Sequence, residues 1–394
     1  MNYILFGDQN RKHLLPFTFI RPVADVRVGI LTIREKWEKF LGKKTSSLTE
    51  EYLSGKYPLK KEADNVLINS SILPNEDLVK AISQLGNNET LSQGDVLIAY
   101  RLSDKDLDSM DDENFEPRKN YEFEDKFERV TYLRDFISLN KDAIISDFEL
   151  ITADRKSASF GELAKVVNPE NVFVEDGARI EMAIINASEG PIYIGKDAHI
   201  MDGAILRGPV SIGEGTKVRM GALLYPGSAV GPYCKVGGEI ANTIIFGYSN
   251  KAHEGYIGDS VIGEWCNIGA GTNFSNLKNN YSKPRIWDYA ENTFIDSQLQ
   301  FCGAFVGDHT KCGINTMLNT GSVIGVNTMI YGSGFLRNFI PSFSWGSAAG
   351  ITIYKFETAL ETARIVMERR GRELTTEDEA ILRFVYNQSF EHKR

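Results

Sequence analysis

The 394-residue chain lacks several features that would assign it to particular classes of protein. It has only four cysteines and no CxxC spacing, which argues against a disulfide framework and favours a reducing compartment. No apolar run approaches the roughly 20 residues needed to span a bilayer. The net charge of −9 disfavours partners such as nucleic acid or an acidic membrane. Residues 3–6 have the pattern of a strand rather than of a signal peptide. We therefore expect a cytoplasmic protein with neither kind of partner.

A hexapeptide repeat fills residues 194–241. Every sixth residue is aliphatic, and the residue four positions later is mostly small, which is typical of a parallel β-helix. Each hexapeptide supplies one short strand and a turn, three hexapeptides make one triangular coil, and coils must stack because one coil cannot bury its own apolar face. The aliphatic positions are Ile194, Ile200, Leu206, Ile212, Val218, Leu224, Val230 and Val236.

The repeat returns at Ile262 and Ile268 and again over residues 306–330, but residues 273–304 break its period. We interpret this break as a loop that leaves the helix body, and loops on rigid scaffolds often carry chemistry. Cys234, Cys266 and Cys312 fall on repeat positions and are expected to be buried. The predicted domains are residues 1–150, 151–340 and 341–394.

The first 150 residues alternate short apolar runs with helical patterns, which predicts a Rossmann-like α/β domain with a parallel sheet. Asn75 is the expected N-cap of one helix. Ligands of such sheets bind at the carboxyl ends of the strands. Residues 104–128 are acidic and aperiodic, which indicates a surface segment. Strands are predicted at residues 3–6, 66–68 and 96–98, and helices at residues 28–41 and 75–85.

Residues 15–18 (Leu-Pro-Phe-Thr) and the following Arg21-Pro22 lie just after the first strand. This pattern resembles the opening of sugar-1-phosphate nucleotidyltransferases, in a divergent branch that carries a hexapeptide domain. The match is partial, because Val23 replaces the family's Lys and residues 69–71 (Asn-Ser-Ser) replace its metal-binding Asp. The resemblance implies Mg²⁺ if the domain is active; a degenerate domain that only binds or packs is the alternative. The implied nucleotide-binding residues are Gly7, Arg11, Arg21, Asp25 and Arg27.

Residues 251–259 read Lys-Ala-His-Glu-Gly-Tyr-Ile-Gly-Asp, and residues 266–272 read Cys-Asn-Ile-Gly-Ala-Gly-Thr. These motifs resemble the acetyltransferase domain of bifunctional GlmU-type enzymes. The resemblance implies a left-handed β-helix, a homotrimer and acetyl-CoA as cofactor. His253 is the expected general base, since His is the side chain that can accept a proton near neutral pH. The implied catalytic and sugar-holding residues are His253, Tyr256, Asn267 and Asn276.

Other positions follow from the same resemblance. Ala270, Asp308 and Thr320 correspond to the acetyl-CoA contacts. The family's phosphate-binding Arg and Lys align with Tyr225 and Ala241, so other cations must hold the sugar phosphate. The candidates are Lys283, Arg285 and Arg219.

Three functions remain open at this stage. The first is bifunctional synthesis of UDP-N-acetylglucosamine, a sugar nucleotide for the cell envelope, from a sugar phosphate, acetyl-CoA and UTP. The second is a nucleotidyltransferase using UTP or dTTP whose β-helix is a trimeric scaffold, and the third is a non-enzymatic trimeric binding scaffold. A zinc site is disfavoured because His199, His253 and His309 lack close spacing.

The C-terminal residues carry two helical patterns. We predict a helix over residues 355–370, closed by Gly371. A second helix is predicted over residues 376–387, with Thr376 as its cap. Together they are expected to cover the last coil.

Overall fold

The chain was studied as a computed structural model, which describes residues 1–108 and 117–392. It forms two compact units. The first consists of Met1–Leu14, Arg21–Val26 and Leu31–Tyr132, and the second consists of Leu15–Ile20, Arg27–Ile30 and Leu133–Arg394. No helix within the described residues has both the length and the apolar character needed to cross a bilayer.

The first unit is built on a six-stranded sheet with the strand order β2-β1-β3-β5-β4-β6. β1 is parallel to β2 and β3, as predicted, but β5 is antiparallel to β3. The prediction of a parallel strand at residues 96–98 was wrong because β4, which follows α3, runs in the direction of β3, and the tight turn after β4 then reverses the chain into β5. The strands are β1 (Asn2–Phe6), β2 (Thr45–Leu48), β3 (Asp64–Asn69), β4 (Glu89–Gln93), β5 (Val96–Ser103) and β6 (Lys119–Glu122).

The helices of the first unit start at side-chain caps. Thr32 and Glu35 form a capping box, so α1 begins at Ile33 and not at residue 28 as predicted. The predicted cap of α3 is confirmed, because Asn75 accepts from the backbone N–H of Leu78. In the acidic segment, α4 and β6 are ordered elements, and residues 109–116 lie outside the described residues. The helices are η1 (Gln9–Leu14), η2 (Val23–Asp25), α1 (Ile33–Leu41), α2 (Glu51–Ser54), α3 (Glu76–Ser83) and α4 (Asp104–Asp108).

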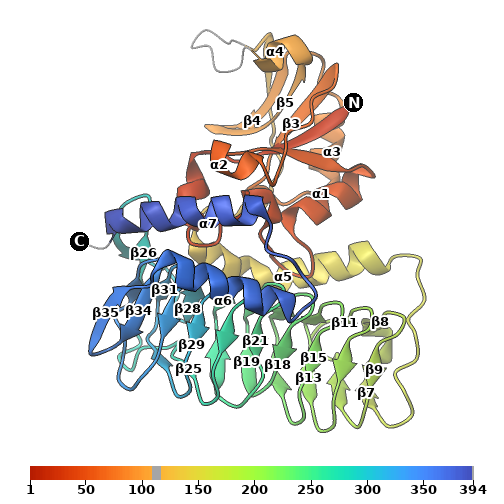
Figure 1. The fold of residues 1–394 in the computed structure, drawn as a ribbon. Helices are drawn as coiled ribbons and strands as arrows, with labels where there is room; N and C mark the ends of the chain where they lie inside the picture. Colours follow the sequence, from red (N-terminus) through yellow and green to blue (C-terminus); the bar gives the residue numbers. More distant parts are fainter. Residues whose placement is uncertain (109–116, 393–394) are drawn as a thin grey trace. The chain divides into compact units, whose positions relative to one another are not determined.

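The second unit contains the predicted parallel β-helix, whose three sheets we call the six-, nine- and ten-stranded faces (Figure 1). The six-stranded face has β7 (Lys165–Val167), β10 (Ile184–Asn186), β13 (Ile205–Arg207), β16 (Leu223–Leu224), β19 (Glu239–Ala241) and β22 (Tyr256–Gly258). The nine-stranded face has β8 (Val172–Val174), β11 (Ile192–Ile194), β14 (Val210–Ile212), β17 (Ser228–Val230), β20 (Ile244–Ile245), β23 (Val261–Ile262), β28 (Ala304–Val306), β31 (Ser322–Ile324) and β33 (Phe339–Ile340). The ten-stranded face has β9 (Arg179–Ile180), β12 (His199–Ile200), β15 (Lys217–Val218), β18 (Lys235–Val236), β21 (Asn250–Lys251), β24 (Asn267–Ile268), β29 (Lys311–Cys312), β32 (Met329–Ile330), β34 (Ser344–Ser347) and β35 (Gly350–Ile353).

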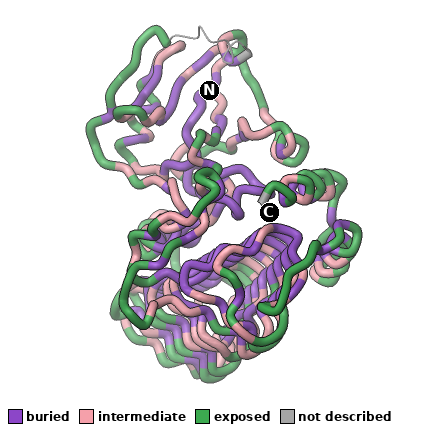
Figure 2. Tube along the Cα trace, turned by 90° about the vertical axis from the view of Figure 1, so that its left-hand side faces the viewer, coloured by how far each residue is buried: buried purple, intermediate pink, exposed green. Residues whose placement is uncertain are grey.

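The core of the β-helix is the ladder of aliphatic side chains that the repeat predicts. All eight residues of the first repeat block are at most 2% exposed, and Figure 2 shows buried chain running through the stacked coils. Burying each such side chain stabilises the fold by about 1.5–3 kcal/mol. Cys234, Cys266 and Cys312 are buried free thiols, as expected. The parallel β-helix is therefore confirmed.

The interruption at residues 273–304 is confirmed as an excursion from the coil. It starts at β25 (Asn273–Phe274), which pairs with β30 (Met317–Leu318), and contains the antiparallel hairpin of β26 (Arg285–Asp288) and β27 (Thr293–Asp296). Trp287 of the hairpin stacks on Phe339 with the ring centroids 4.2 Å apart. The hairpin therefore packs on the later coils.

Helices lie along the sides of the β-helix (Figure 1). α5 (Leu133–Thr152) contacts β17 and β20, and Asn140 Nδ2 donates to the carbonyl of Gly227 at 2.6 Å. In the tail, α6 (Phe356–Glu368) begins beside Phe343 of the last coil. Arg370, just after α6, bonds the Tyr233 carbonyl, so the tail runs back along the body instead of only covering its end.

The second tail helix differs from its prediction by one residue at its start. α7 (Thr376–Gln388) is capped by Thr375, whose side chain accepts from Asp378 N while Asp378 returns the bond. Thr376 is therefore the first helical residue and not the cap.

Candidate active site

His253 lies on a corner loop between β21 on the ten-stranded face and β22 on the six-stranded face. Its side chain is exposed outside the prism, and within the described residues its imidazole makes no hydrogen bond or ion pair. The imidazole is thus available to a ligand. This position agrees with the role of general base that the sequence motif predicts.

A buried lysine holds this corner loop from inside the prism. Lys251 is 1% exposed and occupies an inward rung, in register with Val236 of the coil before. Its Nζ donates to the carbonyls of His253 at 2.5 Å and Glu254 at 2.7 Å. Burial lowers the pKa of Lys251 from its ordinary 10.5 to about 8. Because an aliphatic rung would satisfy neither carbonyl, we infer that Lys251 fixes the backbone that carries His253.

Three residues after His253, Tyr256 begins a hydrogen-bonded network on the six-stranded face. Asn276 Nδ2 donates to the Tyr256 hydroxyl oxygen at 3.0 Å and to Asp259 Oδ2 at 2.7 Å. Asn242 Nδ2 donates to the other carboxylate oxygen of Asp259 at 2.8 Å. Burial, and then the charge of Asp259, raise the pKa of Tyr256. The structure thus brings Tyr256 together with Asn276, two residues from distant parts of the motif.

This network needs a glycine at position 258. A Cβ there would lie 2.3 Å from the Tyr256 hydroxyl oxygen and 2.7 Å from Asn276 Nδ2. Any side chain would therefore displace the network. The hydroxyl oxygen of Tyr256 accepts from Asn276, and no acceptor for its O–H is found among the residues that the structure describes. The hydroxyl can therefore donate to a ligand.

Asn267 does not join this network. It lies exposed on the ten-stranded face, in register with Asn250, whose Nδ2 is 3.5 Å from Asn267 Oδ1. Tyr256 and Asn276 belong to the six-stranded face and its extension. Within one chain the structure therefore places Asn267 on one face, Tyr256 and Asn276 on another, and His253 at the corner between them.

The predicted cofactor contacts have different environments. Ala270 is half-buried, and its carbonyl accepts from Asn315 N at a corner one coil beyond His253. Asp308 is fully buried, and its Oδ1 accepts from Glu264 N at 2.7 Å. The carboxylate of Asp308 is therefore part of the coil, and its predicted contact with acetyl-CoA stays a prediction. Thr320 is 6% exposed beside the hairpin insert.

The three phosphate candidates also separate. Lys283 and Arg285 are exposed on the hairpin insert, where Arg285 donates to the carbonyl of Phe294. Arg219 is half-buried and lies at a corner of the β-helix. His253 lies at the same corner, two coils further along the chain. Only Arg219 of the three therefore belongs to the same corner column as the predicted base.

In the first unit, the predicted nucleotide-binding residues are largely occupied by protein partners. Gly7 is exposed after β1. Arg11 is 9% exposed, its Nε lies 2.9 Å from Glu50 Oε1, and its guanidinium bonds the hydroxyl of Tyr52. Burial raises the pKa of Tyr52 to about 12. Arg21 is buried, whereas Arg27 belongs to the second unit and donates to the carbonyl of Ile30.

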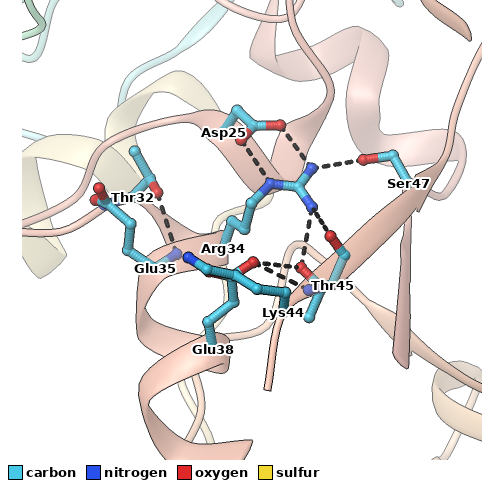
Figure 3. Close-up of polar contacts among 8 residues, drawn as sticks. All are labelled: Asp25, Thr32, Arg34, Glu35, Glu38, Lys44, Thr45 and Ser47. Atoms are coloured by element: carbon cyan, nitrogen blue, oxygen red, sulfur yellow. Dashed lines mark hydrogen bonds and ion pairs between the residues drawn. The ribbon is translucent and has the colours of Figure 1, made fainter. Parts of the chain in front are cut away.

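Asp25 forms a two-pronged ion pair with Arg34 (Figure 3). Its carboxylate oxygens lie 2.7 Å from Arg34 Nε and 2.8 Å from Arg34 Nη2, and Arg34 Nη2 also donates to Ser47 Oγ at 2.5 Å. Burial is the largest single effect on the pKa of Arg34, and it acts to lower that pKa. The hydrogen bond and the charge of Asp25 together outweigh burial, so the pKa of Arg34 is raised. Asp25 therefore joins η2 to α1 and β2.

Replacing Asp25 with Asn is expected to lower the free energy of unfolding by about 1–3 kcal/mol, since it weakens a partly buried charge-assisted pair. Nucleotide affinity at 25 °C should not change beyond this loss of folded protein. Urea unfolding together with nucleotide titration checks the prediction. A specific loss of nucleotide binding at unchanged stability would instead make Asp25 a ligand contact.

The carboxyl ends of β1 and β3 carry a network that the sequence analysis did not predict. Asp8 bonds Arg129, and Asn69 Nδ2 donates to Asp8 Oδ2 at 2.8 Å. Arg129 Nε also donates to Ser71 Oγ at 2.8 Å. The sequence did contain an indication of this network. Asp8 follows the first predicted parallel strand and Asn69 ends the second, and ligands bind at the carboxyl ends of such strands. These residues line the sheet edge where ligands of α/β proteins bind.

This edge does not fit a resident Mg²⁺. The ion is usually held by one or two carboxylates together with substrate phosphates. Here Asp8 is already bonded to Arg129, and Asn69 stands where the related enzymes have an Asp. Among the described residues, no three His, Cys, Asp or Glu side chains are grouped to hold a metal ion.

A cavity of about 790 Å³ lies at the last coil and the tail, lined by residues that include Trp287, Phe335 and Phe390. None of the predicted site residues lines it. This cavity therefore lies apart from the corner of His253, whose side chain is exposed.

The two units combine an α/β sheet with a parallel β-helix, and comparisons with known proteins find similar sequences for parts of this chain. Residues 3–156 match the family model described as sugar nucleotidyl transferase. The chain is 35% identical over 160 residues to a bifunctional sugar-1-phosphate nucleotidylyltransferase/acetyltransferase of Sulfurisphaera tokodaii, covering 40% of this chain and 37% of that protein. It is 36% identical over 107 residues to the bifunctional protein GlmU of Methanococcus aeolicus, covering 27% and 25%.

The predicted resemblance to bifunctional GlmU-type proteins is thus confirmed, and the matches span 37% and 25% of these two relatives' length. Among solved structures, the UDP-N-acetylglucosamine acyltransferase of Francisella novicida overlaps 56% of this chain and 75% of its own. It is 16% identical with a TM-score of 0.26, which is too low to support any argument about function.

Proposed function

We propose that this chain is a bifunctional enzyme of sugar-nucleotide synthesis. Its β-helix transfers acetyl from acetyl-CoA to the amine of glucosamine-1-phosphate. Its N-terminal unit transfers uridylyl from UTP to the N-acetylated product. The observation that carries the acetyl-transfer half is the exposed imidazole of His253, held by Lys251 and adjacent to the network of Tyr256, Asn276 and Asp259.

The chemistry follows from these groups. The amine nitrogen attacks the thioester carbonyl, a C–N bond forms, and the C–S bond breaks. His253 accepts the proton that the amine loses and returns it to the leaving thiolate. Tyr256 donates its O–H to the sugar and, with Asn276, orients it so that the amine faces the imidazole.

We further propose that the active site is completed by a second copy in a homotrimer, in the cytoplasm. Asn267 lies on a different face from Tyr256 and Asn276, which supports a site formed where the faces of two copies meet. The four buried thiols support a reducing compartment.

Mixing two inactive variants tests the shared site. His253→Ala and Asn267→Ala chains are each expected to be inactive. When they are co-expressed in equal amounts, about a quarter of wild-type acetyl transfer should return, because that fraction of sites pairs two intact faces. No recovery in mixed trimers would place the whole site in one chain, and a monomer by light scattering would contradict the assembly.

The nucleotidyl-transfer half rests on the family match of residues 3–156 and on the edge formed by Asp8, Asn69 and Arg129. A pyrophosphate-release assay with N-acetylglucosamine-1-phosphate and each of UTP and dTTP tests it. Release that Arg129→Ala lowers at unchanged stability supports the proposal. Release with no nucleotide would mean that this unit only binds or packs, and acetyl transfer would stand alone.

A further inference from the structure

A column of outward side chains on the ten-stranded face carries stacked positive charges. The parallel register places Lys217 of β15 directly opposite Lys235 of β18. Adjacent strands in such a sheet are about 4.8 Å apart. Arg219 follows Lys217 by two residues at the end of the same strand. Like charges placed directly opposite on neighbouring strands destabilise a sheet, so this arrangement has a cost.

The tail adds two more cations to this column. Arg370 Nη1 donates to the carbonyl of Tyr233 at 2.9 Å, and its Nη2 donates to Asn250 Oδ1 at 2.7 Å. Asn250 is the register partner of Lys235, so these bonds fix Arg370 beside that lysine, with Arg369 next in the chain. Burial, and then the charges of Arg370, Lys217, Arg219 and Arg369, lower the pKa of Lys235. The five cations therefore act on one another.

These charges have no acidic partners in the structure. In the described part of the chain, none of Lys217, Arg219, Lys235 and Arg369 has a carboxylate within ion-pair distance. The chain as a whole carries a net charge of −9, so acidic residues are abundant elsewhere. An ordinary solvated basic face would consist of exposed side chains, but Arg219 and Lys235 are half-buried and Arg370 is fixed by two bonds. A bound anion would relieve the repulsion.

The cation column borders the corner of His253. A Cβ at Gly237 would lie 3.2 Å from Arg219 Cβ and 2.8 Å from the carbonyl of Ala252, the residue before His253. Gly237 and Gly238 thus leave no side chain between Arg219 and the loop of His253. Asn267, predicted to hold the sugar, lies in the same outward column two strands beyond Lys235.

We propose that Lys217, Arg219, Lys235 and Arg369 form a binding site for the phosphate monoester of a substrate of acetyl transfer. A dianion bound there would be surrounded by two exposed cations, Lys217 and Arg369, and two half-buried ones, Arg219 and Lys235, which is the charge arrangement that phosphate requires. The inference rests on the proposed function. Both substrates carry a phosphate monoester, one on the sugar and one on the ribose of CoA, and the test separates them.

The test measures binding by isothermal titration with the full-length chain. Glucose-1-phosphate, which lacks the amine and does not react, probes the sugar phosphate, and CoA compared with dephospho-CoA probes the ribose phosphate. In the double variant Lys217→Gln/Lys235→Gln we expect affinity for one of these phosphates to fall at least ~10-fold. The control Lys165→Gln removes an exposed charge from β7 and should bind like wild type.

Each outcome decides the proposal. A fall for glucose-1-phosphate assigns the site to the sugar, and a fall for CoA but not for dephospho-CoA assigns it to the cofactor. If wild type and double variant bind all ligands equally, the cation site is wrong while acetyl transfer stands. If folded wild type binds none of them, both the site and the proposed function fail. Arg369→Gln, an exposed change outside the β-helix, repeats the test where the double variant unfolds early on heating.

Discussion

Replacing His253 with alanine is expected to lower acetyl transfer by roughly 10²–10⁴-fold, because a positioned general base contributes about that much. The side chain is exposed and makes no hydrogen bond, ion pair or ring contact with the described residues, so its loss should leave the melting temperature unchanged. Thiol release from acetyl-CoA in the presence of glucosamine-1-phosphate measures the effect. Nucleotidyl transfer by the same variant should remain at the wild-type level.

A histidine elsewhere on the β-helix supplies the matched control. His199 pairs with Glu181 through a 2.7 Å contact, away from the corner loop. His199→Gln should retain wild-type acetyl transfer. If instead His253→Ala transfers acetyl as fast as wild type, the corner loop is not the active site, whatever the resemblance of its sequence.

Replacing Lys251 with methionine is expected to lower kcat for acetyl transfer by about 10²-fold, since a displacement of roughly 1 Å in a catalytic group can cost that much. Methionine fills the rung but leaves the carbonyls of His253 and Glu254 without their donor. The loop would then lose its fixed position. KM for acetyl-CoA should change little, because Lys251 lies inside the prism.

The pKa of Lys251 distinguishes this positioning role from a structural one. Its folded pKa of about 8 lies below the ordinary 10.5, so the folded chain binds the proton less tightly than the unfolded chain. The charged lysine therefore costs stability as pH falls from 10.5 to 8, and that cost persists at pH 7. Lys251→Met lacks this group, so its stability relative to wild type should rise as pH falls from 10.5 to 8, while it remains slower at every pH.

Lys311 provides the same substitution at a different corner. Its Nζ donates to the carbonyls of Trp265 at 2.8 Å and His309 at 2.7 Å, and burial lowers its pKa to about 8 as well. Lys311 is half-buried in register with Asn267, so its replacement also disturbs the predicted sugar-holding side of the site. A loss of kcat in Lys251→Met no larger than that in Lys311→Met would mean that these lysines only maintain the coil.

The β-helix could be predicted from sequence because its period is strict. Each coil must place aliphatic side chains in the same interior. The regular spacing of residues such as Ile200 and Val218 therefore indicates the β-helix from sequence alone. The sheet of the first unit was less predictable. The run at residues 96–98 looks the same in a parallel and in an antiparallel strand, and only the short turn from β4 fixes its direction.

The candidate site was predicted in part. The motif identified His253, Tyr256 and Asn276, because chemistry and spacing coincide there. The sequence could not show that the carboxylate of Asp308 accepts a hydrogen bond from a backbone N–H inside the coil. An aspartate at this position is equally compatible with a structural role and with contact to a cofactor. Of the cation column only Arg219 was predicted, because the residues that meet at Lys235 come from adjacent coils and from the distant tail.

The central claim is that an amino sugar phosphate accepts acetyl at the corner of His253. The most direct measurement is thiol release by the purified wild-type chain with acetyl-CoA and glucosamine-1-phosphate, with mass analysis of the sugar. The account predicts one thiol released for each sugar acetylated on nitrogen, and no release without the sugar. A folded, trimeric chain that releases no thiol with glucosamine-1-phosphate or any other amino sugar phosphate would contradict it.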